Sequence, residues 1–263
     1  MKVKSKNGSN MLIGERRQHI LAQIQRDGRV LISELSDHLG ISRITIRKDL
    51  DDLATRGLVR RTHGGALSVQ GTALLDPSLR EKEQKQLKEK QRIARAAADL
   101  VTEGMCVLLD SGTTTTAIAR ELRRFSRLTV ITNALNIATE LAGTDFEILL
   151  TGGALRKNSF SLVGPLAEDM LREVRADILF LGVDGFDART GVMTPNLLES
   201  RVNRAMVKAS VRVVAVCDST KFDRHSLALI APASAIHTVI TDSQISPEDV
   251  EALTAANIEV IRV

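Results

Sequence analysis

The larger part of this sequence repeats one pattern that few folds can accommodate. Five short apolar runs alternate with helical stretches, and Asp, Asn, Ser, Thr or Gly follows each run at once; they read VLLDSGTT, TVITNA, ILLTGGA, LFLGVDGF and VAVCDSTKF. Such alternation is typical of an α/β domain with a parallel sheet. Because parallel strands end on one edge, where ligands bind at the switch in strand order, we expect the five polar strand ends to form one site. Any single turn can hold Gly, Ser or Asp for geometry alone, so the joint pattern is what favours a site.

The first of these strand ends, VLLDSGTTTT from Val107 to Thr116, has the composition of an anion-binding loop. A helix is expected to begin directly after it, so free backbone N–H groups and hydroxyls would face an anion. The loop lacks the Gly-Lys-Ser/Thr ending of a Walker A motif, and no GxGxxG follows a strand, which favours a small phosphorylated molecule over nucleotides. The residues expected at the anion are Asp110, Ser111, Gly112, Thr113, Thr114 and Thr115.

The first quarter of the chain differs in charge. Residues 1–67 hold 13 Lys and Arg against 7 Asp and Glu, whereas residues 68–263 hold 23 against 25, so the net charge of +4 belongs to one end. This asymmetry suggests a polyanion-binding module, with a solvated basic face as the alternative. No Phe, Tyr or Trp precedes residue 68, so stacking on unpaired bases is disfavoured and duplex DNA is the expected partner.

Helical spacing of apolar residues predicts a first helix up to Asp27, a second ending at Gly40 and a third between Ser42 and Gly57. LVRRTHGGAL then predicts a basic β-hairpin. This order is that of a winged helix-turn-helix, whose third helix enters the major groove; a three-helix interaction module is the alternative. The residues expected to meet base edges or phosphates are Ser42, Arg43, Thr45, Arg47 and Lys48 of the helix and Arg60, Arg61 and His63 of the hairpin.

Several other classes of protein find no support in the sequence. No apolar run approaches the roughly 18 residues of a membrane span, and the N-terminus MKVKSKNGSN lacks the apolar centre of a signal peptide, so a cytoplasmic location is expected. Cys106 and Cys217 fall in predicted strands without metal-ligand spacing, and the five histidines are scattered. We therefore expect neither a metal nor a cofactor.

The expected organisation has a small domain and a larger one. It comprises a disordered polar tail over 1–10, a winged helix-turn-helix domain over 11–67, the linker SVQGTALLDPS over 68–78 and a ligand-binding domain over 79–263. In the last of these, the Lys-, Glu-, Gln- and Ala-rich stretch 80–100 predicts one long helix. The fold class expected is an α+β winged helix-turn-helix domain joined to a larger α/β domain with a mostly parallel sheet.

The N-terminal stretch RRQHILAQIQRDGRVLISELSDHLGISRITIRKDLDDLATRGLVRRTHGGAL closely resembles the DNA-binding domain of DeoR-family bacterial transcriptional regulators. The elements typical of that family, TIRKDLDDL and R.HGGA, stand at Thr45 to Leu53 and at Arg61 to Ala66. The resemblance implies DNA binding through the third helix and the hairpin, usually by a repressor of sugar-catabolic genes.

Residues 75–260 resemble the DeoR C-terminal sensor, which is related in fold to ribose 5-phosphate isomerase and similar sugar-phosphate enzymes. This resemblance implies that the DSGTTT loop holds a phosphate and that Asn133, Gly152, Gly153, Asp184, Glu199 and Lys221 line the rest of the pocket. The segments SLVGPLAEDML and DSTKFDRHSLALIAP are most similar to the branch that regulates N-acetylgalactosamine, galactitol or tagatose use.

The choice between a sensor and an enzyme depends on residues between the predicted acids. Aldose–ketose isomerisation needs a positioned base and an acid, and Asp184, Asp187 and Glu199 could nominally serve. The isomerases carry a Lys-Gly-rich segment in this interval, whereas ARTGVMTPNLL has no lysine. With a DNA-binding module attached, we expect a sensor of a phosphorylated sugar, acting as a homodimer or homotetramer on operator DNA. An isomerase-like or deaminase-like enzyme that binds DNA and a scaffold with an inactive pocket are the alternatives.

Overall fold

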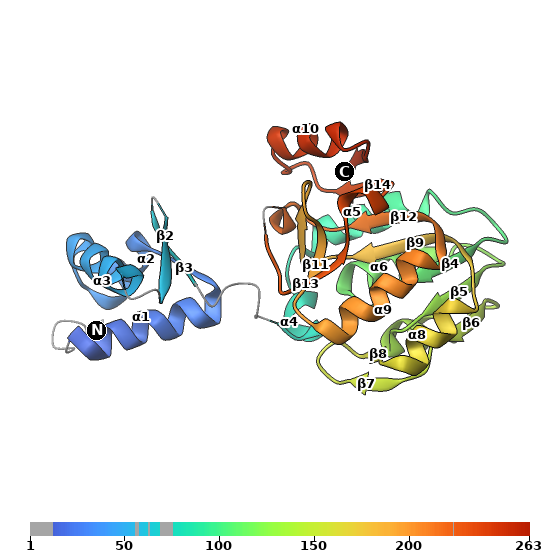
Figure 1. Ribbon diagram of the computed structural model, residues 1–263, viewed down its shortest axis with the longest axis horizontal. Coiled ribbons are helices and arrows are strands. Elements are labelled where there is room, and N and C mark those ends of the chain that lie inside the picture. Colours follow the sequence, from blue (N-terminus) through green and yellow to red (C-terminus); the bar gives the residue numbers. More distant parts are fainter. Residues whose placement is uncertain (1–12, 56–57, 63, 69–75, 223) are drawn as a thin grey trace, which may run out of the picture. The chain divides into compact units, whose positions relative to one another are not determined.

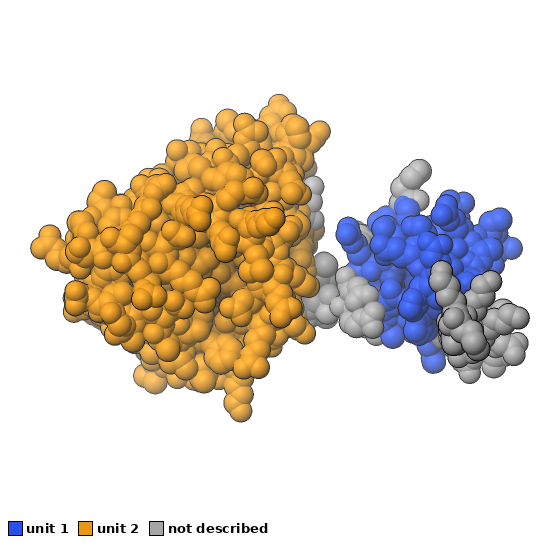
Figure 2. Space-filling model, turned by 180° about the vertical axis from the view of Figure 1, so that it is seen from behind, with its two compact units in different colours: residues 1–75 blue, residues 76–263 orange. Residues whose placement is uncertain are grey.

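The computed structural model describes residues 13–55, 58–62, 64–68, 76–222 and 224–263. The chain divides into two compact units, residues 1–75 and residues 76–263 (Figures 1 and 2). The expected tail over 1–10 and most of the expected linker lie outside the described residues. Ser68 belongs to a strand of the first unit, and residues 76–78 belong to the second. Within these ranges, no helix combines the length and the apolar character needed to cross a membrane.

The first unit has three helices and a small antiparallel sheet. Its elements are α1 (Ile13–Asp27), β1 (Arg29–Leu31), α2 (Ile32–Leu39), α3 (Arg43–Thr55), β2 (Val59–Thr62) and β3 (Gly65–Ser68), and the strand order is β1-β3-β2. The three helices and the hairpin were expected from the sequence, but β1 was not. Three residues that follow a Gly turn are too few to show a strand period, and β1 exists because it pairs with β3.

Local sequence explains the sharp turn between α2 and α3. Gly40 ends α2 in the left-handed conformation, with φ of 64°. The Ser42 hydroxyl then accepts a hydrogen bond from the Thr45 N–H at 3.2 Å and so caps α3. Ile20, Ile24, Leu35, Ile46 and Leu50 are fully buried in one core, which fixes the angle between the helices.

The second unit is built on a seven-stranded parallel sheet. Its strand order is β15-β14-β12-β9-β4-β5-β6, with β4 (Cys106–Leu109), β5 (Thr129–Thr132), β6 (Glu147–Leu150), β9 (Ala176–Gly182), β12 (Ser210–Val216), β14 (Thr238–Thr241) and β15 (Glu259–Arg262). The chain runs outward from β4 to β6 and then returns to place β9 on the other side of β4. The order of the strands therefore switches between β4 and β9, which is where a ligand is expected.

Helices cover both faces of this sheet, and each face has its own core (Figure 1). On one face lie α5 (Leu87–Ala98), α6 (Thr113–Leu122) and α7 (Leu135–Leu141), and on the other lie α8 (Pro165–Arg172), α9 (Leu197–Lys208) and α10 (Pro247–Ala255). Along β4, Val107 and Leu109 enter one core and Leu108 enters the other, as the period of a strand requires. The expectation of a parallel α/β sheet is confirmed.

Smaller elements surround one end of the sheet. They are the hairpin of β7 (Ala154–Arg156) and β8 (Ser161–Val163), and a second sheet formed by β10 (Gly185–Asp187), β11 (Gly191–Thr194) and β13 (Ala228–Ala231). Short 3₁₀ turns occupy Ser219–Lys221 (η1) and Ala233–Ala235 (η2).

The expectation of one long helix over 80–100 was wrong. The structure has two helices, α4 (Leu79–Glu83) and α5, separated by a break in which Gln86 adopts a left-handed conformation with φ of 52°. The Lys90 ammonium donates a hydrogen bond at 2.6 Å to the carbonyl of Lys82 at the end of α4, which also accepts one from the Lys85 N–H at 3.2 Å. This side-chain contact ties α5 to the end of α4 across the break, and helix propensity could not indicate it.

Candidate effector and DNA-binding sites

A cavity of about 440 Å³ lies where the strand order switches, beyond the ends of β4, β9 and β12. It adjoins the loop after each of these strands and the break between α4 and α5. The side chains and backbone that line it come from Pro77, Lys82, Lys85, Gln86, Lys90, Ser111, Gly112, Thr113, Thr114, Gly182, Val183, Asp184, Val216, Cys217, Asp218, Thr220, Lys221 and Arg224. Three of the five polar strand ends thus meet at this cavity.

The hydroxyls of the DSGTTTT loop divide into two groups. Ser111, Thr113 and Thr114 line the cavity at the N-terminus of α6, and no hydrogen bond within the described chain occupies their hydroxyls. The Thr115 hydroxyl instead donates to the carbonyls of Asp110 and Gly112 at 2.9 and 3.1 Å, and Thr116 donates to Gly112 at 2.6 Å. The outer hydroxyls and the helix N-terminus can hold an anion, whereas the inner ones hold the loop.

Cations also line the cavity. Lys82 belongs to α4, Lys85 to the break and Lys90 to α5, and Lys221 and Arg224 follow β12. Lys82 pairs with Asp184 at 2.7 Å, whereas within the described chain no carboxylate lies within ion-pair distance of Lys85, Lys90, Lys221 or Arg224. Five cations therefore face only two carboxylates, those of Asp184 and Asp218. A phosphate dianion suits this imbalance.

The pKa values of the lining residues reflect the crowding of cations. Burial lowers the pKa of Lys90 to about 8, and the nearby ammonium groups of Lys221 and Lys82 act in the same direction. Burial likewise lowers the pKa of Lys221. Burial alone would raise the pKa of Asp184, but Lys82, Lys221 and Arg224 outweigh that effect and hold it below its ordinary value. An incoming anion would stabilise the charged form of both lysines.

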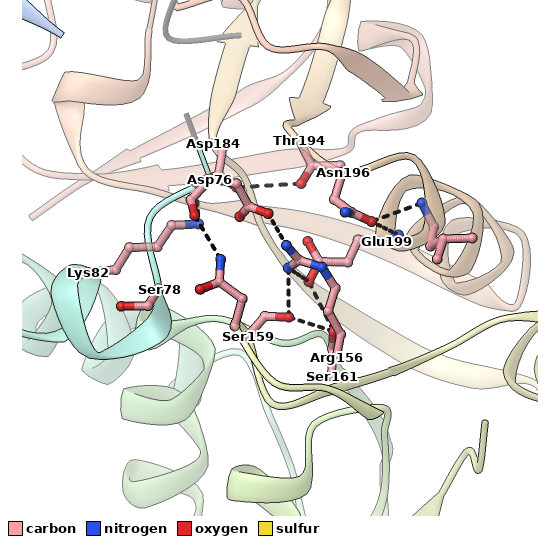
Figure 3. Close-up of polar contacts among 12 residues, drawn as sticks. Asp76, Ser78, Lys82, Arg156, Ser159, Ser161, Asp184, Thr194, Asn196 and Glu199 are labelled. Carbon is pink, nitrogen blue, oxygen red and sulfur yellow. Dashed lines mark hydrogen bonds and ion pairs between the residues drawn. The ribbon is translucent and has the colours of Figure 1, made fainter. Parts of the chain in front are cut away.

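A second, smaller cavity of about 30 Å³ adjoins the first, and it is lined mainly by acceptors. The two cavities share Pro77, Lys82, Ser111, Gly112, Gly182 and Asp184, and the smaller one adds Leu79, Asp110, Ser159, Thr194, Glu199 and Asn203. Figure 3 shows how its rim is held: Arg156 joins Asp76 to Glu199, and Ser161 donates to the same Glu199 oxygen at 2.9 Å. Glu199 sits in the first turn of α9, which Asn196 caps.

Four predicted residues line neither cavity. Thr115 is fully buried behind the loop, as described above. Asn133 is also fully buried, and its amide donates to the carbonyl of Leu162 at 3.2 Å, which ties the end of β5 to β8. Gly152 and Gly153 have φ of 70° and 112°, and a Cβ on Gly153 would lie 2.6 Å from the Val163 carbonyl oxygen. These residues shape the strand ends, and their polar or Gly character has a structural cause.

The sequence did not indicate four of the five cations that line the larger cavity, nor Thr194 and Asn203 of the smaller one. Lys82, Lys85 and Lys90 belong to a stretch whose composition predicts a solvated helix, and only the break between α4 and α5 brings them to the cavity. Arg224 lies beyond the predicted strand end. The other predicted residues, Asp110, Ser111, Gly112, Thr113, Thr114, Asp184, Glu199 and Lys221, all line one of the two cavities.

A groove of about 600 Å³ lies elsewhere on the second unit, between α8 and α9, and is lined by side chains such as Arg172, Arg175 and Arg204. It meets no strand end and no helix N-terminus with free hydroxyls, so the cavity at the strand switch is the better candidate site. Among the described residues, no cluster of three or more His, Cys, Asp or Glu side chains has the arrangement of a metal site.

In the first unit, α3 presents a cationic face. Ser42, Arg43, Arg47 and Lys48 are exposed and Thr45 is half-buried. The acidic residues of α3 are neutralised elsewhere: Asp49 pairs with Arg16 and Arg17, Asp52 with Arg17, and Asp51 with Arg61. Ile44 is 66% exposed on the same helix, an apolar residue that the sequence reading did not single out and that could contact a thymine methyl group.

The hairpin arginine Arg61 has a structural partner. Its guanidinium donates to Asp51 at 2.6 Å and also to the Gly65 carbonyl, so it holds the hairpin against α3 instead of projecting freely. Arg60 lies in β2, but its side chain and all of His63 lie outside the described residues. The predicted phosphate contacts of the hairpin therefore have no structural account.

The buried carboxyl of Asp110 leads to a pH-dependent prediction. Burial raises the pKa of Asp110 to about 7, and the Glu199 and Asp184 carboxylates act in the same direction. A hydrogen bond from the Gly182 N–H lowers the pKa but is outweighed. The folded protein therefore loses stability as pH rises from the ordinary aspartate range through 7. Asp110→Asn is expected to avoid this loss and to gain about 2 to 3 kcal/mol over the parent between pH 5 and pH 8.

This difference is measurable by urea unfolding of the second unit followed by circular dichroism, because the chain has no Trp or Tyr. Asp145→Asn, at an exposed carboxyl, is the matched control and should show no such change. An Asp110→Asn effect that is equal at both pH values would contradict the raised pKa.

Comparison with known proteins assigns both units. Residues 16–72 match the DeoR-like helix-turn-helix domain, and residues 85–243 match the DeoR C terminal sensor domain. The chain belongs to the DeoR family. It is 40% identical over 251 residues to a protein of Escherichia coli O157:H7 that is assigned by name to transcriptional repression of the aga operon, covering 95% of this chain and 93% of that one. It is 32% identical over 246 residues to the glycerol-3-phosphate regulon repressor of Escherichia coli strain K12, covering 93% and 97%.

Among solved structures, ribose 5-phosphate isomerase A from Methanocaldococcus jannaschii aligns with 51% of this chain and 53% of its own, with a TM-score of 0.38 and 18% identity. A likeness of this extent has no bearing on function. The two domains of this DeoR-family chain are the winged helix-turn-helix and the α/β domain with a parallel sheet that the sequence predicted, so the family resemblance and the fold class are confirmed.

Proposed function

We propose that this DeoR-family protein represses a carbohydrate-utilisation operon and that a phosphorylated sugar, bound at the cavity beyond β4 and β9, releases it from operator DNA. The observation that carries the proposal is the cavity itself. A helix N-terminus, three hydroxyls that no described residue engages and five cations line a space of about 440 Å³, in a chain that also has a helix-turn-helix. That volume is in the range of small-molecule sites.

The names of the relatives agree with this class of regulator. One is named for repression of the aga operon and another as the repressor of the glycerol-3-phosphate regulon. Glycerol 3-phosphate, which the second name mentions, is a small phosphorylated polyol. A helix N-terminus beside a cluster of lysines would favour a ligand of this class.

On the DNA side, the exposed cations of α3 support a role as recognition helix. Arg43 and Arg47 are positioned on its first turns to reach base edges or flanking phosphates, and Lys48 to neutralise a phosphate. Two copies of the helix would be needed to read successive major grooves about 34 Å apart, so a homodimer or homotetramer is part of the proposal.

The path from the cavity to the linker is short in sequence. Asp76 is the first residue of the second unit, and its carboxylate pairs with Arg156. Three further contacts dock the same segment: Asn158 donates to the Asp76 carbonyl at 2.7 Å, Leu79 N–H donates to Asn158 at 2.8 Å, and Lys82 pairs with Asp184 in the cavity. A ligand that competes for Lys82 would therefore alter the anchoring of the residues that follow the linker. A ligand changes DNA affinity only if it binds one conformation of the protein more tightly than another.

Two of the three acidic residues considered for isomerisation, Asp184 and Glu199, are engaged in ion pairs, and Asp187 accepts hydrogen bonds from the Arg189 and Thr190 N–H groups. Lys82 neutralises Asp184, and Glu199 accepts hydrogen bonds from Arg156 and Ser161. Carboxylates held in this way can still accept hydrogen bonds from a sugar, and the cations around Asp184 hold the pKa of that carboxyl below its ordinary value, which makes Asp184 a weaker base. The arrangement favours a binding role.

The direct test is a gel-shift titration on DNA upstream of the protein's own gene and its neighbours, repeated with hexose phosphates, amino-sugar phosphates and the corresponding unphosphorylated sugars. Specific binding that one phosphorylated sugar abolishes is the expected result. Specific binding that no sugar phosphate changes would refute the proposed effector, while leaving the DNA-binding role in place.

Two substitutions should separate the two activities. Arg47→Ala removes an exposed cation of α3 and is expected to weaken operator binding roughly tenfold to a hundredfold without changing sugar phosphate affinity. Thr113→Val removes a free hydroxyl of the loop and is expected to do the reverse, leaving a repressor that responds poorly to the effector.

Each substitution has a matched control on the exposed surface of the second unit: Arg175→Ala for the arginine and Thr102→Val for the threonine. Gel shift and calorimetry give the two affinities. If either Arg47→Ala or Thr113→Val damaged both activities in a folded protein, the assignment of DNA binding and sensing to separate units would be incorrect.

A further inference from the structure

The two adjoining cavities of the second unit differ in charge. The larger one is rich in Lys and Arg, while the smaller one is lined by three carboxylates, those of Asp110, Asp184 and Glu199, with Lys82 as its only cation among the described lining residues. Because the two spaces share six lining residues, one molecule can occupy both. A ligand whose phosphate lies in the larger cavity would place another of its groups in the smaller one.

The smaller cavity contains acceptors that the protein leaves without partners. Asp110 is 1% exposed and Asn203 is 5% exposed, and among the described residues neither the Asp110 Oδ1 nor the Asn203 Oδ1 has a hydrogen-bond partner. Buried polar atoms are almost always hydrogen-bonded, so two such oxygens beside one cavity indicate that a donor is missing. They are separate from the loop hydroxyls that face the phosphate.

Two glycines lie next to the buried Asp110 Oδ1. A Cβ on Gly182 would lie 3.3 Å from Oδ1, and a Cβ on Gly112 would lie 3.8 Å from it. Both glycines line both cavities, so neither contributes a side chain beside Oδ1.

The charges around the smaller cavity determine what kind of donor fits. Lys82 neutralises Asp184, and the Arg156 guanidinium is shared between Glu199 and Asp76. Asp110 has no cationic partner among the described residues. Bringing a positive group to Asp110 would relieve the repulsion among three neighbouring carboxylates, which a neutral hydroxyl would not do.

From this arrangement we infer that the effector is a phosphorylated sugar with a free amine, whose ammonium group binds Asp110 and Asn203 in the smaller cavity. The inference rests on the proposed function and names the ligand class for the same site. A volume of about 30 Å³ holds one or two water-sized groups, so an ammonium fits. An N-acetylated amine does not, because it adds a carbonyl and a methyl group and removes the charge.

Calorimetry on the full chain tests the inference with sugars that differ only at one carbon. The probes are glucose 6-phosphate, glucosamine 6-phosphate and N-acetylglucosamine 6-phosphate, the three matching galactose compounds, and inorganic phosphate. In at least one series, the free amine is expected to bind about tenfold tighter than the hydroxyl and N-acetyl forms, as a charged hydrogen bond predicts.

Two variants show whether the smaller cavity is responsible. Asp110→Asn and Asn203→Leu should each reduce the preference for the amine to less than about threefold, measured within each variant as the ratio between the affinities of the amine and of the matching hydroxyl form. Asp145→Asn, at an exposed carboxyl, should keep the full preference.

The outcomes distinguish this inference from the proposed function. Sugar phosphates that bind with no preference for the amine would overturn the inference and would show that water satisfies Asp110 and Asn203. The same conclusion follows if the preference survives in both variants. Failure of all six sugar phosphates to bind would overturn the proposed function as well.

Discussion

Gly65→Ala is expected to abolish DNA binding by disrupting the fold of the first unit. A Cβ at this position would lie 1.9 Å from the Val30 carbonyl oxygen and 3.2 Å from the Leu31 Cα. Both are backbone atoms that no rotamer change can move, and Gly65 is paired with Leu31 in the β1–β3 ladder. The ladder must separate, which exposes buried Val30 and Ala66. We expect a loss of at least about 3 kcal/mol of stability in this unit.

The adjacent residue provides the control for this prediction. A Cβ on Gly64 would meet nothing within 4 Å, so Gly64→Ala should retain DNA binding. Circular dichroism, gel shift and effector calorimetry on the full chain compare the two variants. Equal DNA affinity of Gly65→Ala and Gly64→Ala would show that the close approach of β1 and β3 does not constrain the hairpin.

Gly185→Ala is expected to produce the opposite defect, a protein that binds DNA and no longer responds to effector. A Cβ on Gly185 would lie 2.0 Å from the Arg224 carbonyl oxygen. The segment that contains Arg224 must therefore move away from β10, and Arg224 lines the larger cavity. Loss of this wall should weaken sugar phosphate binding at least tenfold, since it removes a cation and opens the site to water.

Gly143→Ala is the matched control, because a Cβ there meets nothing within 4 Å and the residue lines neither cavity. Calorimetry with inorganic phosphate and sugar phosphates, followed by gel shift with and without effector, separates binding from response. A Gly185→Ala protein that binds and responds like Gly143→Ala would mean that the β10–Arg224 contact does not shape the cavity.

The two substitutions act on different units, and the expected results follow from that division. The first unit contains its own buried core, centred on Ile46 and Leu50, and the second contains two cores on the faces of its sheet. Damage to one core is not expected to unfold the other, so each activity can be lost separately.

The elements that could be predicted are those whose signals are local in the sequence. The period of apolar residues defined α1, α2 and α3, Gly40 and Ser42 marked the turn between the last two, and alternating runs indicated the parallel sheet. The loop at Ser111 to Thr114 was also predicted, because a strand, a small polar turn and a helix follow each other directly in the chain.

Which polar side chains reach the cavity depends on contacts between segments that are far apart in the chain. Asn133, Gly153 and Thr115 have the residue types of a site and yet serve the backbone, whereas Lys82 and Lys90 reach the cavity from a stretch that reads as solvated helix. The physical reason is the distance over which the deciding contacts act. Lys82 pairs with Asp184, 102 positions along the chain, and Arg156 pairs with Asp76, 80 positions away, so no periodicity within either segment could indicate the partner.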